Sequence, residues 1–363
     1  MKFWKWPSEA PAPVTFRGPV PLRVVARAMC CSVGHHARAA TAAINAHMNH
    51  FRETEFVDDS GDVLIGAALH EVPVWGAERL RLMLHAVVAE SLQSANDVGL
   101  HTEQIAIMLL TPEAERPGMP HDALADDLAD LAAGNIPGMG PFHAKSAMYA
   151  YGKAGIARLL QEAGDALAEG DAPSHVLLVA VDSLLDAGAI EHFLACERLA
   201  TTDNADGFIP GEGAAALLLS IQAADQPALW IESGATALES WRIDGDVPLR
   251  ANGLVNAMRE AERAAGIKVG ALDFHASGMT GESWYAKEVS LAVTRVLEER
   301  KPEFPHSIIA SRVGETGAAS SVLTLAWLSD VMGRSENAPG RSALLHFAGD
   351  DGHRCALVVR HRQ

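Results

Sequence analysis

The sequence of 363 residues predicts an α/β fold made of two similar halves. Apolar stretches typical of buried strands alternate with stretches whose apolar residues recur at helical spacing. A polar joint at 222–226 separates two runs with this same order. Each run closes on an aromatic residue, a turn of glycines and acidic residues and a buried strand, at 208–219 and 347–359. This faint internal repeat indicates a duplicated unit with pseudo-two-fold symmetry.

These patterns divide the chain into an irregular arm at 1–20, an N-terminal half at 21–221 and a C-terminal half at 228–363. The arm carries four prolines and reads as a loosely packed terminus.

In the first half, the most regular pattern lies at 156–167, where apolar residues recur at i, i+3, i+4, i+7 and i+11 and predict an amphipathic helix. The turn signal Asp58–Gly61 between two apolar stretches predicts a hairpin within 52–68. Further helices are predicted at 38–50 and 78–94, and buried strands at 22–29, 105–110, 175–181 and 214–219.

In the second half, Gly266 is the expected C-terminal cap of a helix at 254–265. Two more helices are predicted at 284–298 and 316–331. Strands are predicted at 230–235, 271–275, 308–311, 344–347 and 355–359.

Composition excludes several classes of function. A formal charge of −17 argues against nucleic-acid binding through a basic surface and against docking on anionic membranes. No apolar run reaches the roughly 20 residues that a membrane helix needs. Four cysteines, two of them adjacent, do not make a disulfide framework in a chain of this length. We therefore expect a cytoplasmic protein.

Four collinear motifs carry a resemblance to a known family. They are AMCCSVG at 28–34, DGFIPGEGA at 206–214, FHASGMT at 274–280 and SRVGETGAA at 311–319. With these segments the chain resembles the β-ketoacyl synthases of the thiolase-like superfamily over residues 22–361. The resemblance implies a five-layer αβαβα sandwich, usually a homodimer, whose chemistry uses a cysteine nucleophile and two histidines on acyl thioesters.

The chemistry of that family is incomplete here. Its cysteine is expected after Gly140-Pro141, between 149 and 153 and best at Gly152, yet no cysteine occurs between Cys31 and Cys196. His275 corresponds to the first family histidine, but Glu315 stands at the second. Only a thiolate both attacks a thioester and leaves easily, so condensation by the family mechanism is not expected.

Each candidate residue also has a structural interpretation. His275 is either a retained ligand or a buried histidine at a strand end. Glu315 is favoured as a first-turn carboxylate near Arg312 over a catalytic acid. Ser146 and Lys153 lie near the missing nucleophile, and His275 is the base available to them. His35-His36 lacks the spacing of a zinc site, and we expect no metal and no cofactor.

Two functions follow from the resemblance. The first is a non-catalytic dimeric module for binding or assembly. The segment 47–58 is similar to thiolase-like proteins found beside type VI secretion effectors, which suggests a role in effector loading. The alternative is an acyltransferase or condensing enzyme, or a subunit like a chain-length factor. The partners expected are a second copy, an effector, a carrier protein or a ketosynthase subunit.

Overall fold

The computed structural model describes residues 21–97, 99–245, 248–334 and 338–362, together with the backbone of two short strands, β1 (Trp4–Lys5) and β2 (Thr15–Phe16). The predicted irregular arm at 1–20 lies outside the described residues apart from these strands. β1 pairs with the outer edge of β7, and β2 pairs with β10. None of the described helices is both long and apolar enough to span a membrane.

One mixed sheet of twelve strands passes through both halves of the chain. The order of the first five large strands is β7 (Ala147–Ala150), β6 (Ile105–Thr111), β8 (His175–Ser183), β9 (Glu212–Ser220) and β3 (Leu22–Cys31). The second five follow as β10 (Ala228–Leu238), β14 (His353–Arg362), β13 (Ser342–Ala348), β11 (Phe274–Ser277) and β12 (His306–Ile308).

The two groups of five strands repeat one pattern of pairing. β6 lies parallel to both β7 and β8, and β11 lies parallel to both β12 and β13. β9 and β14 are each antiparallel to both of their neighbours. This symmetry confirms the fold of two pseudo-repeated halves. The exact domain limits stay a prediction.

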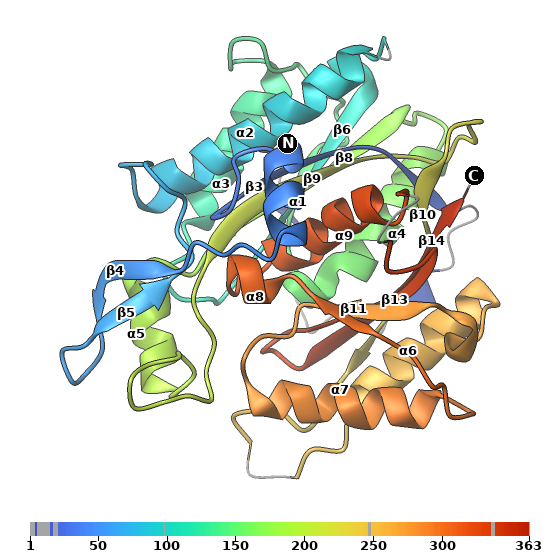
Figure 1. Ribbon diagram of the computed structural model, residues 1–363. Helices are drawn as coiled ribbons and strands as arrows, with labels where there is room; N and C mark the ends of the chain where they lie inside the picture. Colours follow the sequence, from blue (N-terminus) through green and yellow to red (C-terminus); the bar gives the residue numbers. More distant parts are fainter. Residues whose placement is uncertain are drawn as a thin grey trace.

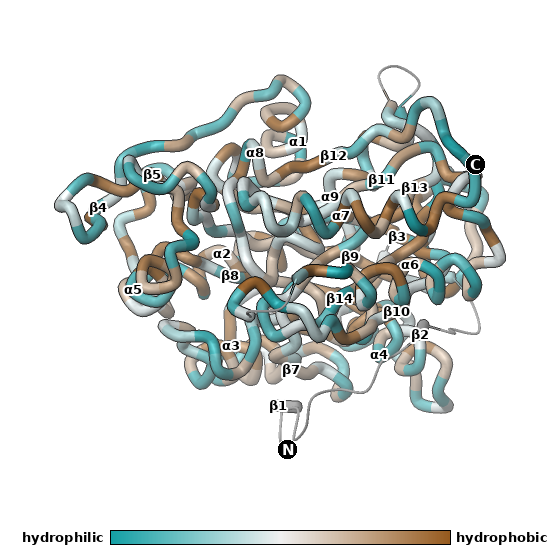
Figure 2. Tube along the Cα trace, turned by 90° about the horizontal axis from the view of Figure 1, so that it is seen from below, coloured by the Kyte–Doolittle hydropathy of each residue, from teal (hydrophilic) through white to brown (hydrophobic). Residues whose placement is uncertain are grey.

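Helices build the remaining layers (Figure 1). α4 (Ile156–Ala168) and α9 (Ala319–Val331) lie between the two parts of the sheet and share one apolar core with both of them. α2 (Gly76–Asp97) and α3 (His121–Ala133) cover the outside of the first part. α6 (Asn252–Ala265) and α7 (Ser283–Val296) cover the outside of the second. This is the predicted five-layer αβαβα sandwich, and Figure 2 shows the apolar stretches mainly inside it.

Some predicted elements are wrong in place or type. The strand expected at 271–275 is β11 at Phe274–Ser277, which carries the strand past His275. The strand expected at 308–311 ends at Ile308 and gives way to a short helix, α8 (Ala310–Val313). α3 and α5 (Ala187–Ala195) were not predicted. The hairpin is confirmed as β4 (Arg52–Val57) and β5 (Val63–Gly66), and α1 (Ala37–Asn45) is shorter than expected.

Candidate functional site

The carboxyl ends of the parallel strands meet at the middle layer, where open α/β sheets commonly bind ligands. Here they form a charged cleft, which we define by Glu113, Arg116, Lys153, Asp182, Arg198, Glu315 and Asp350. Glu113 follows β6, Lys153 follows β7 and Asp182 lies near the end of β8. Glu315 precedes α9, and Asp350 follows β13. Both halves of the chain therefore contribute to one site.

Gly152 occupies the sharp turn from β7 toward α4, the place where the family cysteine is expected. Its backbone has φ 62° and ψ −177°, a conformation that is essentially restricted to glycine. A Cβ atom at this position would lie 1.9 Å from Oε1 of Glu113. The carboxylate of Glu113 thus fills the space that a nucleophilic side chain would need.

Lys153 and Glu315 form an ion pair across the cleft. The Lys153 Nζ donates to Glu315 Oε2 at 2.7 Å, and both side chains are largely buried. The other carboxylate oxygen of Glu315 accepts from the backbone N–H of Gly317 at 2.8 Å. The predicted contact of Glu315 with Arg312 is wrong, because Arg312 bonds to His47 instead. Glu315 also lies outside the first turn of α9, which begins only at Ala319. Lys153 is engaged as a cation and is not a free amine nucleophile.

Two arginines pair with Asp182 and Asp350, two more carboxylates of the cleft. Arg116 Nη2 lies 2.6 Å from Asp182 Oδ1, while Asp182 Oδ2 accepts from the N–H of Ala318 at 2.7 Å. Arg198 donates through Nε to Glu282 at 2.7 Å and pairs through Nη1 with Asp350 at 2.9 Å. These contacts fix the charged groups in place, as a structural ion network does.

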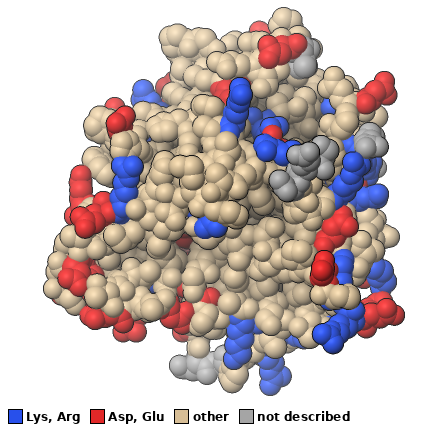
Figure 3. Space-filling model, in the orientation of Figure 1, with Lys and Arg blue, Asp and Glu red and all other residues tan. Residues whose placement is uncertain are grey.

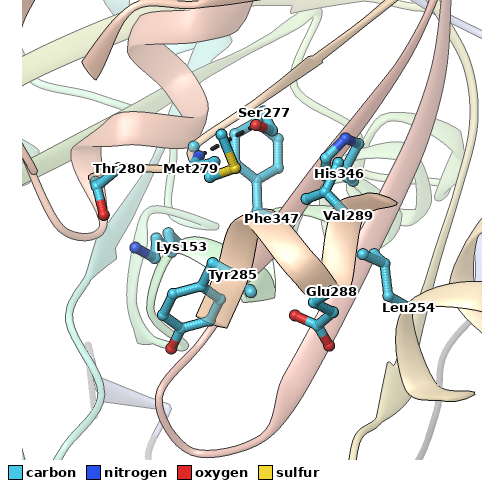
Figure 4. A pocket seen from close by; sticks show the side chains of 12 residues that line it. Lys153, Leu254, Ser277, Met279, Thr280, Tyr285, Glu288, Val289, His346 and Phe347 are labelled. Carbon is cyan, nitrogen blue, oxygen red and sulfur yellow. Dashed lines mark hydrogen bonds between the residues drawn. The ribbon is translucent and has the colours of Figure 1, made fainter. Parts of the chain in front are cut away.

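Little space remains inside the cleft. Its free volume is about 40 Å³. A neighbouring apolar cavity, lined by Lys153, Ser277, Met279, Tyr285 and Phe347, has about 20 Å³ (Figure 4). A cavity needs roughly 10–15 Å³ to hold one water molecule. Each space therefore accommodates only a few waters, and neither accommodates an acyl chain.

Two carboxyl groups of the cleft hold their protons more tightly than usual. Burial, together with the nearby charge of Asp351, raises the pKa of Glu113 to about 7. Burial also raises the pKa of Asp182 to about 6, against the opposing effect of Arg116. A protonated Glu113 is a neutral group that can lie beside the other carboxylates at lower repulsion.

We expect the free energy of unfolding to fall as pH rises from the ordinary pKa of a glutamate, 4.5, to the folded pKa of Glu113, about 7. Its folded pKa of about 7 exceeds the ordinary value of 4.5, so the folded protein keeps a proton that the unfolded chain has lost. The stabilisation is complete below pH 4.5 and is lost as pH rises through 7. Glu113→Gln lacks this titration. Its unfolding free energy relative to the wild type should therefore be about 1–3 kcal/mol higher at pH 8 than at pH 5.

Urea unfolding at the two pH values measures this difference. Glu115→Gln, an exposed change in the same loop, is the matched control and should follow the wild type. An unchanged pH dependence in Glu113→Gln would show that Glu113 does not carry the effect.

His275 lies away from the charged cleft. Because β11 continues to Ser277, the chain reaches the cavity of Figure 4 only at 277–280, beyond His275. The His275 ring stacks on Phe304 and His306, with centroid distances of 4.9 and 4.1 Å. Its Nδ1 lies 3.1 Å from Nε2 of His346. His275 is thus not among the residues that line the charged cleft with Glu315, and a catalytic role for either remains a prediction.

The remaining nucleophile candidates are also occupied or buried. Ser146 Oγ donates to the carbonyl of His143 at 2.8 Å and accepts from the N–H of Ile107 at 3.0 Å. Cys30 and Cys355 are buried, and burial raises the pKa of each thiol to about 12. Cys31 is buried as well, with a pKa of about 11, whereas Cys196 is exposed at the end of α5. Reactive cysteines have low pKa values, so the buried thiols are inert.

The family-like run at 206–214 has a structural role in this chain. Its Glu212 is fully buried and pairs with Arg79 of α2, whose Nε donates at 2.8 Å. Glu212 also accepts from the N–H of Leu69 and from Ser183 Oγ. The glutamate therefore anchors α2 to β9, and removing one partner of such a buried pair costs about 3–5 kcal/mol.

Sequence reasoning missed several residues of the cleft. Glu113, Arg116 and Arg198 carry no motif, and Asp350 belongs to the turn at 347–359 without a predicted role there. These residues meet only in the folded chain. Asp182 gave a usable signal, since it is a charged residue that interrupts the apolar strand β8.

No protein-family model matches the chain, and no curated protein matches it in sequence. Solved structures share its fold. A chain of the AntDE:AntF complex, described as a type II polyketide synthase acyl-carrier protein with its ketosynthase, has a TM-score of 0.75 at 14% identity and covers 95% of this chain and 100% of that chain.

Two further structures have the same fold. The Xenorhabdus doucetiae structure of the ketosynthase ApeO with its chain length factor ApeC has a TM-score of 0.69 at 13% identity, over 94% of this chain and 98% of that one. A β-ketoacyl synthase from Burkholderia phymatum STM815 has a TM-score of 0.68 at 17% identity, over 95% of this chain and 100% of that one. At these identities the likeness shows the thiolase-like ketosynthase fold.

Proposed function

We propose that this protein is a ketosynthase-like subunit without condensing activity, which works as a dimeric module for binding or assembly. The observation that carries the proposal is the position of Glu113, whose carboxylate occupies the space beside Gly152. A condensing enzyme needs a nucleophile and room for an acyl chain at this turn. Here the turn has neither, while the surrounding fold is intact.

The proposal places function on the surface of the molecule. The β4–β5 hairpin projects from the body beside α5 (Figure 1). Leu64 and Phe56 pack toward α5, while Val57, Val63 and Ile65 on the other face are 53, 47 and 37% exposed. The exposed Glu53 pairs with Ile65 on this face, so the face combines three apolar side chains with a carboxylate. Exposed apolar side chains on a two-stranded hairpin are a favourable contact for another chain. This hairpin includes part of the segment 47–58, whose resemblance to thiolase-like proteins beside type VI secretion effectors extends the proposal to effector loading.

The alternative is a subunit that works beside an active condensing enzyme. Similarity in fold to structures of ketosynthases with their chain length factors supports it. Co-purification with a cysteine-bearing homologue would favour this alternative over self-association. Figure 3 shows that charged side chains are sparse at the centre of the face over α1, α8 and α9. A surface with few charges favours a protein contact, because few charged groups have to be desolvated.

The assembly role predicts a dimer that depends on the hairpin. Light scattering should give twice the mass of one chain for the wild type. The variant Val57→Lys/Ile65→Lys should give the mass of one chain, because each lysine would have to be desolvated in the contact. Circular dichroism should stay unchanged, since both side chains face solvent.

Leu238→Lys is the control, because Leu238 is as exposed as Val57 but lies at the end of β10. It should remain a dimer. A monomeric wild type would contradict the dimeric module, and a dimeric Val57→Lys/Ile65→Lys variant would contradict the use of the hairpin.

A further inference from the structure

Three histidines from separate parts of the chain meet on the second part of the sheet. His306, His275 and His346 lie on the adjacent parallel strands β12, β11 and β13. His275 pairs in register with His306, and Ser277 pairs with His346. Alternate residues of a strand share a face, so all four side chains lie on the same face of the sheet. Leu344 belongs to this face too, and it packs in the core formed with α6 and α7.

The ring nitrogens of the three histidines converge. One nitrogen from each ring lies within 4.8 Å of those of the other two. His275 Nδ1 and His346 Nε2 are 3.1 Å apart. Zinc binds imidazole nitrogen at about 2.0–2.1 Å, so two nitrogens on a tetrahedral ion lie roughly 3.4 Å apart. The closest pair, which shares a hydrogen bond in this structure, is already near this separation, and the widest pair needs a shift of about 1.5 Å.

The chemical state of the rings suits a metal ion. Burial lowers the pKa of His275 to about 3 and that of His306 to about 4, and it lowers the pKa of His346 in the same direction. All three imidazoles are therefore neutral at pH 7, and each keeps a lone pair for a metal. Neutral rings also approach one another without the repulsion that three imidazolium ions would have.

Ser277 lies beside His306 as the hydrogen-bond partners of metal-binding histidines commonly do. Ser277 Oγ lies 2.7 Å from Nε2 of His306. Metal-binding histidines are commonly oriented through a hydrogen bond at the ring nitrogen that does not bind the ion. His306 is half-buried and lines a groove of about 710 Å³ with Asn45, Arg312 and Trp327. Of the three histidines, His306 is the one that lines this groove.

We propose that His275, His306 and His346 bind one divalent transition-metal ion, with zinc the best match. Nitrogen ligands and a three-histidine set suit zinc, and a fourth position is left for water or an anion. This site shares no residue with the charged cleft, although Ser277 and His346 line the small cavity beside it, and it goes beyond the proposed assembly role. It also departs from the sequence expectation of no metal, which considered neighbouring pairs such as His35-His36. His36 instead caps α1 through a bond from the N–H of Ala39.

The test uses the full chain, first freed of metal by a chelator and then titrated with Co²⁺. Four-coordinate Co²⁺ bound to nitrogen gives visible absorption, which one equivalent of Zn²⁺ should remove by displacement. The expected result is saturation at one ion per chain and a higher melting temperature with Zn²⁺. His306→Phe keeps a ring in the stack but removes the nitrogens. It should weaken Zn²⁺ binding by more than about 100-fold, since even a supporting partner is worth about 10–100-fold.

Two further variants separate the site from adventitious binding. Ser277→Ala should weaken Zn²⁺ binding by about 10–100-fold. His47→Asn, at an exposed histidine lining the same groove, should bind like the wild type. The proposal is overturned if the wild type shows no saturable binding at one equivalent, or if His306→Phe binds as tightly as His47→Asn. None of these readouts involves a thioester or a partner chain, so failure here leaves the assembly role untouched.

Discussion

Replacing Gly152 with cysteine, which would return a thiol to the expected nucleophile position, destabilises the protein and creates no acyl acceptor. The backbone of Gly152 has φ 62°, and a residue with a side chain in this region costs about 1–3 kcal/mol. The new Cβ atom would also lie 1.9 Å from Oε1 of Glu113, so this flexible carboxylate would have to turn away, and an unfavourable rotamer costs roughly 0.5–1.5 kcal/mol. Together we expect a loss of about 1.5–4.5 kcal/mol in the free energy of unfolding, measured by urea denaturation.

A double-mutant cycle separates the two causes. Glu113→Ala in the Gly152→Cys background removes the clash but keeps the strained backbone, so the two changes should couple by about 0.5–1.5 kcal/mol. Gly170→Cys is the matched control, because a Cβ atom there meets nothing within 4 Å. Equal stability of the Gly152 and Gly170 variants, or strict additivity with Glu113→Ala, would contradict the occupied site.

The fold could be predicted because its signals are local. The helix expected at 156–167 is α4 at Ile156–Ala168, since its apolar spacing depends only on neighbouring residues. α3 was missed although Leu124, Leu128 and Leu131 recur at helical spacing and are buried. The strand expected at 308–311 failed for a different reason. Ile308 and Ile309 favour a strand by composition, but the chain turns into α8 directly after them.

For the candidate site, the sequence predicts only that the family cysteine is missing. The sequence shows that no cysteine stands near Gly152, but it does not show which side chain fills that space. Glu113 reaches Gly152 because β6 and β7 are parallel neighbours whose carboxyl ends coincide. The histidine cluster is hidden for the same reason, as His275 and His346 are separated by 71 residues and meet only through strand pairing. A motif search along the chain detects neither contact.

The largest functional effect we expect is the complete absence of thioester chemistry. No thiol stands at the β7–α4 turn, and Lys153 is held by Glu315. A carboxylate at the position expected for a histidine repels the negative charge that develops on a thioester oxygen. Loss of one oxyanion donor alone typically costs about 2.7–4 kcal/mol in the barrier. With the nucleophile missing as well, neither acyl transfer nor decarboxylation should exceed the protein-free rate.

The most direct measurement is the intact mass of the purified protein after incubation with malonyl and long-chain acyl thioesters, with product analysis of the same samples. A cysteine-bearing ketosynthase assayed in parallel shows that the substrates are competent. We predict an unchanged mass and no decarboxylated product. A stable acyl adduct on Cys196, Ser146 or Lys153, or turnover that disappears in His275→Ala, would contradict a subunit that assembles without condensing.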